Sequence, residues 1–369
     1  MLTPCRWRAE IRPVRHSWPA VLVAVGVALA GCANNAAGPS VPTTTGYVPP
    51  GVPTEGTHPP ANKLPPAAEP QSAPPQSAQI PGRIVAVGDS PEGVVADGVT
   101  RTVAVAKRNP NELVLLNADT GTITGRTALP GFARHLELAG AGGPVLVPME
   151  SANALIRVDL PGGHPGPQIV TGTVPHDAAQ AQNGTIFVAN ELGGTVAVVR
   201  GDKVVMAFSD VVQPAGTAAV GQSVGVLDVR KNDLTVYDAA ALKIIGSTPA
   251  GQGPTHLVAD KHGRMIAADT RGNAIRVFTP LPSPREVASI PQPGGPYGIA
   301  YDPVRDRLWV ASSGTNQVVG YDMTQATPRA VQQLPTVQNP YTLGVDPGTG
   351  RLFIAGVTGG IVQIIDGPT

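Results

Sequence analysis

The segment PYGIAYDPVRDRLWVASSGTNQVVGYD, residues 296–322, contains the pattern that decides the fold. A proline is followed by two variable residues and a short apolar run, and an Asp-Pro turn then leads to a basic residue and a second apolar run. A turn rich in Gly and Asn precedes a third run. Strands of four to six residues between turn residues, without a helical period, predict antiparallel β-structure.

The proline that opens this pattern recurs along the chain. Its spacings of 42, 42, 39, 40, 42 and 44 residues average about 41.5, the length of a four-stranded propeller blade. We therefore predict an all-β fold, a seven-bladed β-propeller over residues 82–369. The anchor positions, with alanine in place of proline once, are Pro91, Ala133, Pro175, Pro214, Pro254, Pro296 and Pro340.

Turn residues support the same assignment. An aspartate follows the first run of several units, where its carboxylate can accept hydrogen bonds from amides further on in the turn, as at Asp97, Asp260, Asp302 and Asp346. A residue that tolerates positive φ is expected between the second and third strands, at Asn153, Gly194, Asn232, Asn273, Asn316 and Gly360.

The two ends of the repeat region do not match the other units. The seventh unit stops after its third strand, at Asp366, and an unused strand, residues 83–87, precedes the first unit. If residues 83–87 pair with residues 361–365, the N-terminal strand completes the last blade and closes the ring. Such a closure removes an open sheet edge.

Residues 1–31 have the features of a bacterial lipoprotein signal peptide. Four arginines precede an uncharged apolar run of about ten residues, too short to span a bilayer, and the run ends in Leu29-Ala30-Gly31-Cys32. This ending resembles the lipobox, in which acyl chains such as palmitate are joined to the cysteine and the chain is cut before it. We expect Cys32 to carry a lipid anchor that holds the protein at the outer face of the cell membrane.

Residues 32–81 have the composition of a tether. Twelve prolines and only three charged residues lie between Ala33 and Ile80, and no apolar period is present. Pro-rich chains favour an extended conformation and build no core of their own. We predict a disordered linker that acts as a spacer, with docking to a proline-recognising partner as the alternative.

Charge and motifs exclude several function classes. The chain has 26 basic and 26 acidic residues, so no basic surface for nucleic acid is expected. The sequence contains no His-Glu-x-x-His, no phosphate-binding Gly-x-x-x-x-Gly-Lys and no Cys-x-x-Cys-His. We predict no cofactor and no metal, and we expect a protein without catalytic activity.

Two short runs carry a family resemblance. Leu308-Trp309-Val310-Ala311-Ser312 and Ile186-Phe187-Val188-Ala189-Asn190, within their repeat units, resemble the YVTN/YncE-type surface propellers over residues 82–369. Together with the lipobox and the tether, the chain resembles actinobacterial lipoproteins of the LppL kind. The resemblance implies a cell-envelope protein without assigned catalysis. Val310 after Trp309 departs from the WD40 pattern.

The two residues after each anchor are expected at the mouth of the central channel, where the innermost strands begin. Several have side chains that bind ligands: imidazoles and carboxylates, an arginine for anions, and tyrosines for sugars or aromatic groups. The alternatives are a water-filled polar rim and a metal site, although joint ligation of one ion by His135 and His256 is harder because they are three blades apart and nearly opposite in the ring. The predicted channel ligand-binding residues are Glu92, Arg134, His135, His176, Asp177, His256, Tyr297 and Tyr341.

Three functions remain open. The first is a membrane-anchored binding or scaffold module of the cell envelope, with an envelope protein, peptide or glycan as its ligand. The second is a channel-site hydrolase of the lactonase or sugar-acid type, whose metal would need carboxylate and Asn ligands such as Asn190, Asp228 and Asp269. The third is an accessory subunit of an envelope-assembly complex. Propellers host many functions, so the fold does not choose among these.

Overall fold

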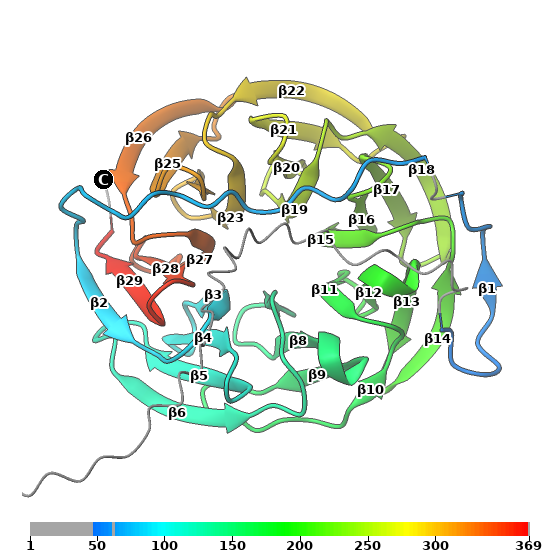
Figure 1. Cartoon of the computed structure of the whole chain (residues 1–369). Helices are drawn as coiled ribbons and strands as arrows, with labels where there is room; N and C mark the ends of the chain where they lie inside the picture. The colour runs from blue at the N-terminus through cyan, green and yellow to red at the C-terminus, as the bar shows by residue number, and fades with distance from the viewer. Residues whose placement is uncertain (1–46, 61–62, 368–369) are drawn as a thin grey trace, which may run out of the picture. The chain divides into compact units, whose positions relative to one another are not determined.

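Seven four-stranded antiparallel sheets form the blades of a propeller around a central channel (Figure 1). The computed structural model describes residues 47–60 and 63–367. Within these ranges the helical elements are two 3₁₀ turns, η1 (Glu150–Ala152) and η2 (Glu191–Gly193). The predicted all-β, seven-bladed fold is confirmed.

Blades one to three follow each other in sequence. They consist of β3 (Pro91–Asp97), β4 (Thr102–Lys107), β5 (Glu112–Asn117) and β6 (Ile123–Ala128); β7 (Glu137–Leu138), β8 (Val145–Met149), β9 (Ala154–Val158) and β10 (Ile169–Val170); and β11 (Pro175–Gln180), β12 (Ile186–Asn190), β13 (Thr195–Arg200) and β14 (Lys203–Phe208).

Blades four to six repeat this order. They consist of β15 (Pro214–Val220), β16 (Ser223–Asp228), β17 (Asp233–Asp238) and β18 (Lys243–Pro249); β19 (Pro254–Ala259), β20 (Met265–Asp269), β21 (Ala274–Thr279) and β22 (Arg285–Pro291); and β23 (Pro296–Asp302), β24 (Arg307–Ser312), β25 (Gln317–Asp322) and β26 (Arg329–Pro335).

The seventh blade is closed by the N-terminal strand, as predicted. It contains β27 (Pro340–Val345), β28 (Leu352–Gly356), β29 (Ile361–Ile365) and β2 (Arg83–Ala86). β2 is antiparallel to β29, with Val85 opposite Val362, and the Val87 amide donates to the Gly360 carbonyl at 2.9 Å. Val87 is fully buried in a cluster that joins blade seven to blade one.

The predicted turn residues have the predicted roles. Asn153, Asn232, Asn273 and Asn316 have φ between 51° and 57°, and Gly194 and Gly360 have φ of 60° and 65°. The carboxylates of the turn aspartates accept backbone hydrogen bonds; Asp302, for example, accepts from the Val304 amide at 2.9 Å. These positions are where the sequence requires a left-handed residue or an acceptor side chain.

A β-bulge follows each anchor proline. The inner strands of all blades except the second begin at the proline itself, and their register with the second strand shifts directly afterwards, as between Pro296 and Ile299. A bulge bends a strand and changes the direction of its side chains. It thereby separates the residues after each anchor from the regular ladder, at one end of the channel.

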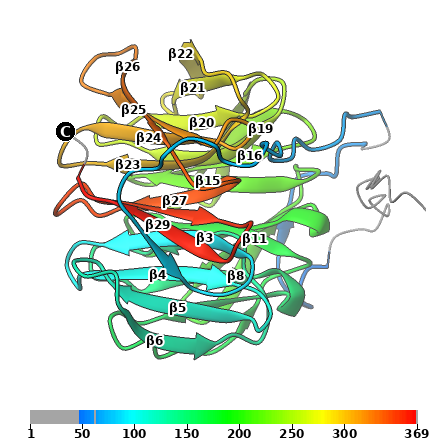
Figure 2. The ribbon, with the colours of Figure 1, turned by 60° about the vertical axis from the view of Figure 1, so that its left-hand side comes forward.

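The part of the predicted tether that the structure describes lies on the propeller. β1 (Thr54–Glu55) pairs in parallel with β14 and extends the third sheet to five strands. Residues 64–81, which we call the strap, cross one face of the ring (blue in Figure 1) and curve down beside β29 (Figure 2). The strap's hydrogen bonds join Pro66 to Arg271, Gln71 to Ser313, Ala73 to Asn339 and Gln76 to Thr336.

The strap differs from the disordered spacer that the sequence predicts. It has the extended backbone expected of a Pro-rich chain, but an extended backbone exposes carbonyls and amides that polar side chains at the blade ends can bind. Two of its own residues, Ala68 and Ala73, are buried. The structure therefore describes these residues as a peptide held by blades four to seven.

The predicted signal peptide, residues 1–31, and Cys32, the predicted lipidation site, lie outside the described residues. In the ranges that the structure describes, no helix is both long and apolar enough to cross a membrane.

Candidate functional site

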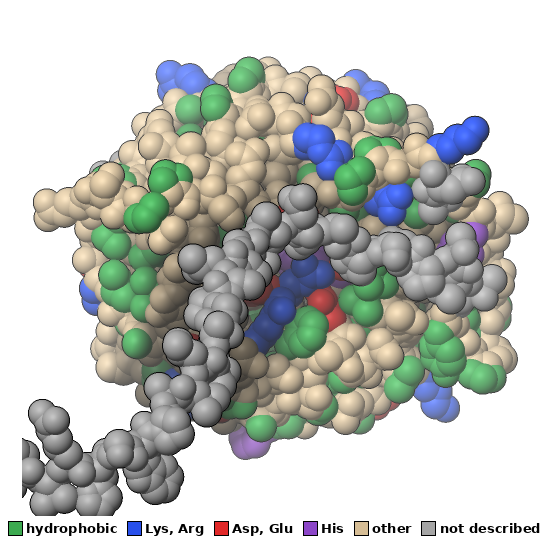
Figure 3. All heavy atoms as spheres, viewed as in Figure 1, with side chains coloured by type: hydrophobic (Ala, Val, Ile, Leu, Met, Phe, Trp, Pro, Cys, Tyr) green, Lys and Arg blue, Asp and Glu red, His purple; other side chains and the backbone are tan. Residues whose placement is uncertain are grey.

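The channel mouth beneath the strap is a hollow in which charged side chains and histidines gather (Figure 3). A cavity of about 290 Å³ lies there. Six of the eight predicted site residues line this cavity or the smaller pocket beside it, and the strap contributes its own carboxylate from Glu69. The cavity is lined by Glu69, Pro70, Glu92, Arg108, Arg134, His135, Tyr297, Tyr341 and Thr342.

An ion network forms the floor of the mouth between blades two and three. The Arg134 guanidinium donates to Glu150 at 2.6 Å and to Glu191 at 2.9 Å. His176 Nδ1 lies 2.8 Å from Glu150 Oε1, and Gln213 donates to Glu191 at 2.9 Å. The network holds two carboxylates, one guanidinium and one imidazole, so it is neutral when the imidazole is protonated.

Glu150 and Glu191 are the site residues that the sequence reasoning missed. Each directly follows the second strand of its blade and opens a 3₁₀ turn. The register of the repeats contained the signal, because in five of the seven blades the residue after the second strand lines the mouth, joins its ion network or binds the strap. These equivalent residues are Arg108, Glu150, Glu191, Val229 and Ser313.

The three histidines are in contact, which corrects the expectation that His135 and His256 are too far apart. The centroid of the His135 ring lies 4.2 Å from that of the His176 ring and 4.4 Å from that of the His256 ring. His256 Nε2 is 3.2 Å from His135 Nδ1. The channel is narrow enough at this level for side chains from nearly opposite blades to meet across it.

The protonation of the histidines follows from their neighbours. Burial lowers the pKa of His135 well below its ordinary value, and burial together with His176 and Arg134 lowers the pKa of His256 to about 3. Burial also acts to lower the pKa of His176, but the carboxylates of Glu191 and Glu150 outweigh it and raise that pKa. His176 is therefore the cationic member of the group, and the other two imidazoles are neutral near pH 7.

The remaining predicted residues occupy different levels of the mouth. Glu92 pairs with Arg108 at 2.9 Å on the upper wall. Asp177 lies deeper, where its carboxylate accepts from the Thr217 and Ala178 amides at 2.8 and 2.9 Å, and burial raises its pKa to about 6. Asp177 therefore does not join the ion network of its neighbour His176.

Two tyrosines form the wall opposite the ion network. The Tyr297 ring meets His256 edge-on, with centroids 4.3 Å apart, and is buried. Tyr341, 5.8 Å from Tyr297, is half-buried and lines the cavity. Tyr341 is thus the aromatic ring available for stacking on a ligand.

The arrangement can be tested for a metal centre. One ligand atom each of Glu150, His176 and Glu191 lies within 4.8 Å of the others, a set of oxygen and nitrogen donors that could hold an ion. Arg134 already donates to both carboxylates, so an ion there would replace the guanidinium and the His176 proton.

The carboxylate and amide groups proposed for a lactonase-like metal have other partners. Asp228 and Asp269 are fully buried, and each accepts hydrogen bonds from the backbone of the loop before its blade, as from Val212 to Asp228 at 2.6 Å. The Asn190 side chain donates to the Thr171 carbonyl at 3.0 Å. These three residues fix loops, which removes the sequence support for a metal set built from them.

Comparison with known proteins supports the fold. No family model and no curated protein matches the chain. A chain of Kuenenia stuttgartiensis hydrazine synthase is 15% identical, with 79% of this chain and 98% of that one covered and a TM-score of 0.66. Virginiamycin B lyase from Staphylococcus aureus is 16% identical, with 78% and 99% covered and a TM-score of 0.62.

A further similar structure is a chain of the mitotic checkpoint complex, 10% identical over 81% of this chain and 98% of that one, with a TM-score of 0.66. At these identities the likeness establishes the propeller fold and leaves function open. The chain thus shares the propeller architecture with these proteins.

Proposed function

We propose that this chain is a lipid-anchored propeller of the bacterial cell envelope that acts as a non-catalytic binding module, with the channel mouth as its ligand site. The observation that supports this most is the cavity of about 290 Å³, which combines a stacking ring, Tyr341, with the ion pair of Glu92 and Arg108. Concave sites with a few convergent polar groups are the usual small-ligand sites of proteins.

The chemistry of the mouth favours binding over catalysis. His176 is held by Glu150, and His135 and His256 contact each other. Each imidazole is thus engaged with a neighbour, whereas a general base must reach a substrate proton. A polar envelope ligand fits these walls: a glycan that stacks on Tyr341, or a peptide or envelope protein whose charges meet Arg108 and Glu92.

Protein partners are also compatible with the fold. A propeller chain of similar structure belongs to the mitotic checkpoint complex. The blades here already hold one extended peptide, the strap, through side-chain hydrogen bonds to its backbone. An accessory role in an envelope-assembly complex is therefore one form of the proposed binding function.

Substitution Cys32→Ser tests the anchored location. Without the thiol no acyl chain can be attached, so the protein should move from the membrane fraction to the soluble extracytoplasmic fraction, as measured by fractionation and immunoblotting. Cys5→Ser, in the segment removed on cleavage, is the matched control and should leave the distribution unchanged. Retention of Cys32→Ser in the membrane would refute the lipid anchor.

The second candidate is a metal-dependent hydrolase of the lactonase or sugar-acid type, because Glu150, His176 and Glu191 could hold an ion. A histidine NMR titration separates the two functions. If the binding module is correct, His176 titrates with a pKa above its ordinary value, and His256 stays neutral from pH 5 to 8 because its pKa is about 3.

The sign of the pH effect follows from the same shift. Because folding raises the pKa of His176, its bond to Glu150 contributes stability that is fully present below about pH 6.5 and is lost as pH rises through the folded-state pKa. One equivalent of Zn²⁺ or Mn²⁺ should leave the His176 titration unchanged. A bound ion that abolishes the titration, in protein purified with that ion at one per chain, would favour the hydrolase.

A further inference from the structure

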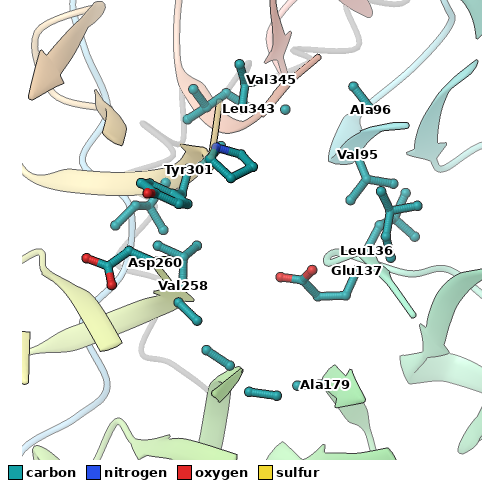
Figure 4. Close-up of a pocket in the computed structure, with 18 of the residues that line it drawn as sticks. Val95, Ala96, Leu136, Glu137, Ala179, Val258, Asp260, Tyr301, Leu343 and Val345 are labelled. Atoms are coloured by element: carbon teal, nitrogen blue, oxygen red, sulfur yellow. The ribbon is translucent and has the colours of Figure 1, made fainter. Parts of the chain in front are cut away.

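Beyond the histidine layer, the inner strands enclose a second cavity of about 490 Å³ (Figure 4). It is lined by the later residues of β3, β11, β15, β19, β23 and β27 and by β7, on the side of the channel away from the strap. Asp177 and the contact of His135 with His256 lie between this cavity and the mouth. The two cavities therefore have different walls.

The walls of the second cavity are mostly small apolar side chains. Alanine, valine, leucine and isoleucine make up most of the lining, and the side chains with charged or amide groups are Glu137, Gln180, Asp260 and Lys261. Figure 4 shows the Glu137 carboxyl group pointing into the open space from β7. Glu137 is the one acidic side chain aimed at the middle of this cavity in the close-up.

The Glu137 carboxyl group lacks a cation. Among the described residues its hydrogen-bond donor is the Leu138 amide, and no ion pair with it is formed. The neighbouring charges are used elsewhere: Asp260 pairs with Arg264 at 2.6 Å, and the Lys261 ammonium lies 3.6 Å from Asp306. Burial and the nearby Asp177 raise the pKa of Glu137 to about 8. The cavity thus holds an acid whose negative form has no partner of opposite charge.

The far entrance to this cavity is apolar as well. A shallow pocket of about 440 Å³ continues from it, with Ala96, Leu138, Tyr301, Pro303 and Val345 lining both. Val99 and Val304 stand at this entrance, and each is 68% exposed. Large exposed apolar side chains beside an apolar cavity are typical of ligand entrances.

We propose that this end of the channel binds a small apolar molecule that carries one amine, with the ammonium group on Glu137 and the hydrocarbon part against the alanine and valine walls. An ammonium group supplies the positive charge that Glu137 lacks, and the partly buried position of Glu137 strengthens the attraction between the two groups relative to water. A carboxylate ligand would add a third acid beside Glu137 and Asp177, and a neutral alcohol would gain a hydrogen bond without the ion pair.

Matched probes test this site. Cyclohexylamine, cyclohexanol and cyclohexanecarboxylate share one ring and differ in charge. They are titrated calorimetrically at about pH 9, above the Glu137 pKa of about 8 and below that of an alkylammonium group, into the mature lipidated protein in lipid nanodiscs, with empty nanodiscs as the blank. The amine should bind about tenfold more tightly than the alcohol, as expected for a hydrogen bond to a charged group, and the carboxylate should not bind.

Two variants test whether Glu137 causes the preference for the amine over the alcohol. Glu137→Gln keeps the size of the side chain and removes its charge, so the preference for the amine over the alcohol should disappear. Glu55→Gln, at an exposed position of β1 outside both cavities, should keep the preference. Equal affinities for amine and alcohol in the wild type, no binding of the amine, or an amine preference that survives Glu137→Gln would each overturn the proposal.

Discussion

Substituting Val87→Asp should destabilise the propeller by at least about 3 kcal/mol, because it places a charge in the contact that closes the ring. Val87 is fully buried with Val94, Phe353 and Ile364, so its environment includes both the first and the last blade. The free energy of unfolding from urea titration measures the effect. If the ring opens between blades seven and one, the backbone amides of these two blades should lose more protection against hydrogen exchange than the amides of the other blades.

Ile84→Asp is the matched control. Ile84 lies on the same closing strand but is 51% exposed, so the same change of residue type puts its charge in water. Its cost should stay within about 0.5 kcal/mol. Equal losses for the two variants would mean that the buried side of the closing strand does not hold the ring together.

Arg134→Met should cost about 3 kcal/mol or more, since it leaves two buried carboxylates without their shared cation. Arg134 donates to both Glu150 and Glu191, whose other hydrogen-bond partners are His176 for Glu150 and Gln213 for Glu191. Burial acts to raise the pKa of Glu150, but His176 and Arg134 outweigh it and lower that pKa, so loss of the guanidinium should let it rise. The penalty should therefore shrink as the pH falls and Glu150 takes up a proton.

Arg329→Met controls for the loss of an arginine as such. The Arg329 side chain is 79% exposed, and its contact with Asp322 is 3.9 Å long, so its removal should change the free energy of unfolding by no more than about 0.5 kcal/mol. A cost for Arg134→Met that is equally small, or that does not depend on pH, would show that the ion network at the mouth does not behave as a buried pair.

The fold could be predicted because its signals are local and repeated. Each blade carries its own anchor, turn aspartate and left-handed turn residue, and the count of units followed from their spacing. The closing strand was predictable for the same reason: residues 83–87 had no blade of their own, and the last blade lacked a strand. The fold can be predicted from such a sequence because the anchors, turn aspartates and left-handed turn residues all favour the same arrangement of strands.

The site was only partly predictable because it depends on how far side chains reach across the channel. Six of the eight residues predicted for the mouth line its cavity or the pocket beside it, and Asp177 and His256 lie deeper; the bulges after the anchors place these residues at that end of the channel. Glu150 and Glu191 were missed because they belong to a different position of the repeat, one residue beyond the second strand. The contact of His135 with His256 depends on the channel width, which no pattern in the sequence encodes.

The strap was not predictable from composition alone. Its prolines predict an extended chain, which the structure has, but not where that chain lies. Its place is set by single polar contacts from separate blades, such as Arg271 to the Pro66 carbonyl and Asn339 to the Ala73 amide. These partners lie more than 200 residues away in sequence.

The most direct test of the account is the affinity of an envelope ligand for the channel mouth. Glycans and peptides released from the native envelope are captured on the intact lipidated protein, and the bound compound is titrated into the wild type, Tyr341→Ala and Tyr47→Ala. Tyr47 is 49% exposed and lies outside the cavity lining, so it is the matched control. Loss of a stacking ring should weaken binding about tenfold or more.

The account predicts that Tyr341→Ala loses this affinity, that Tyr47→Ala retains it, and that the compound has the same mass after incubation with the wild type. A compound that binds Tyr341→Ala as tightly as the wild type would contradict the assignment of the mouth as the ligand site. A compound recovered with a changed mass would contradict the non-catalytic role.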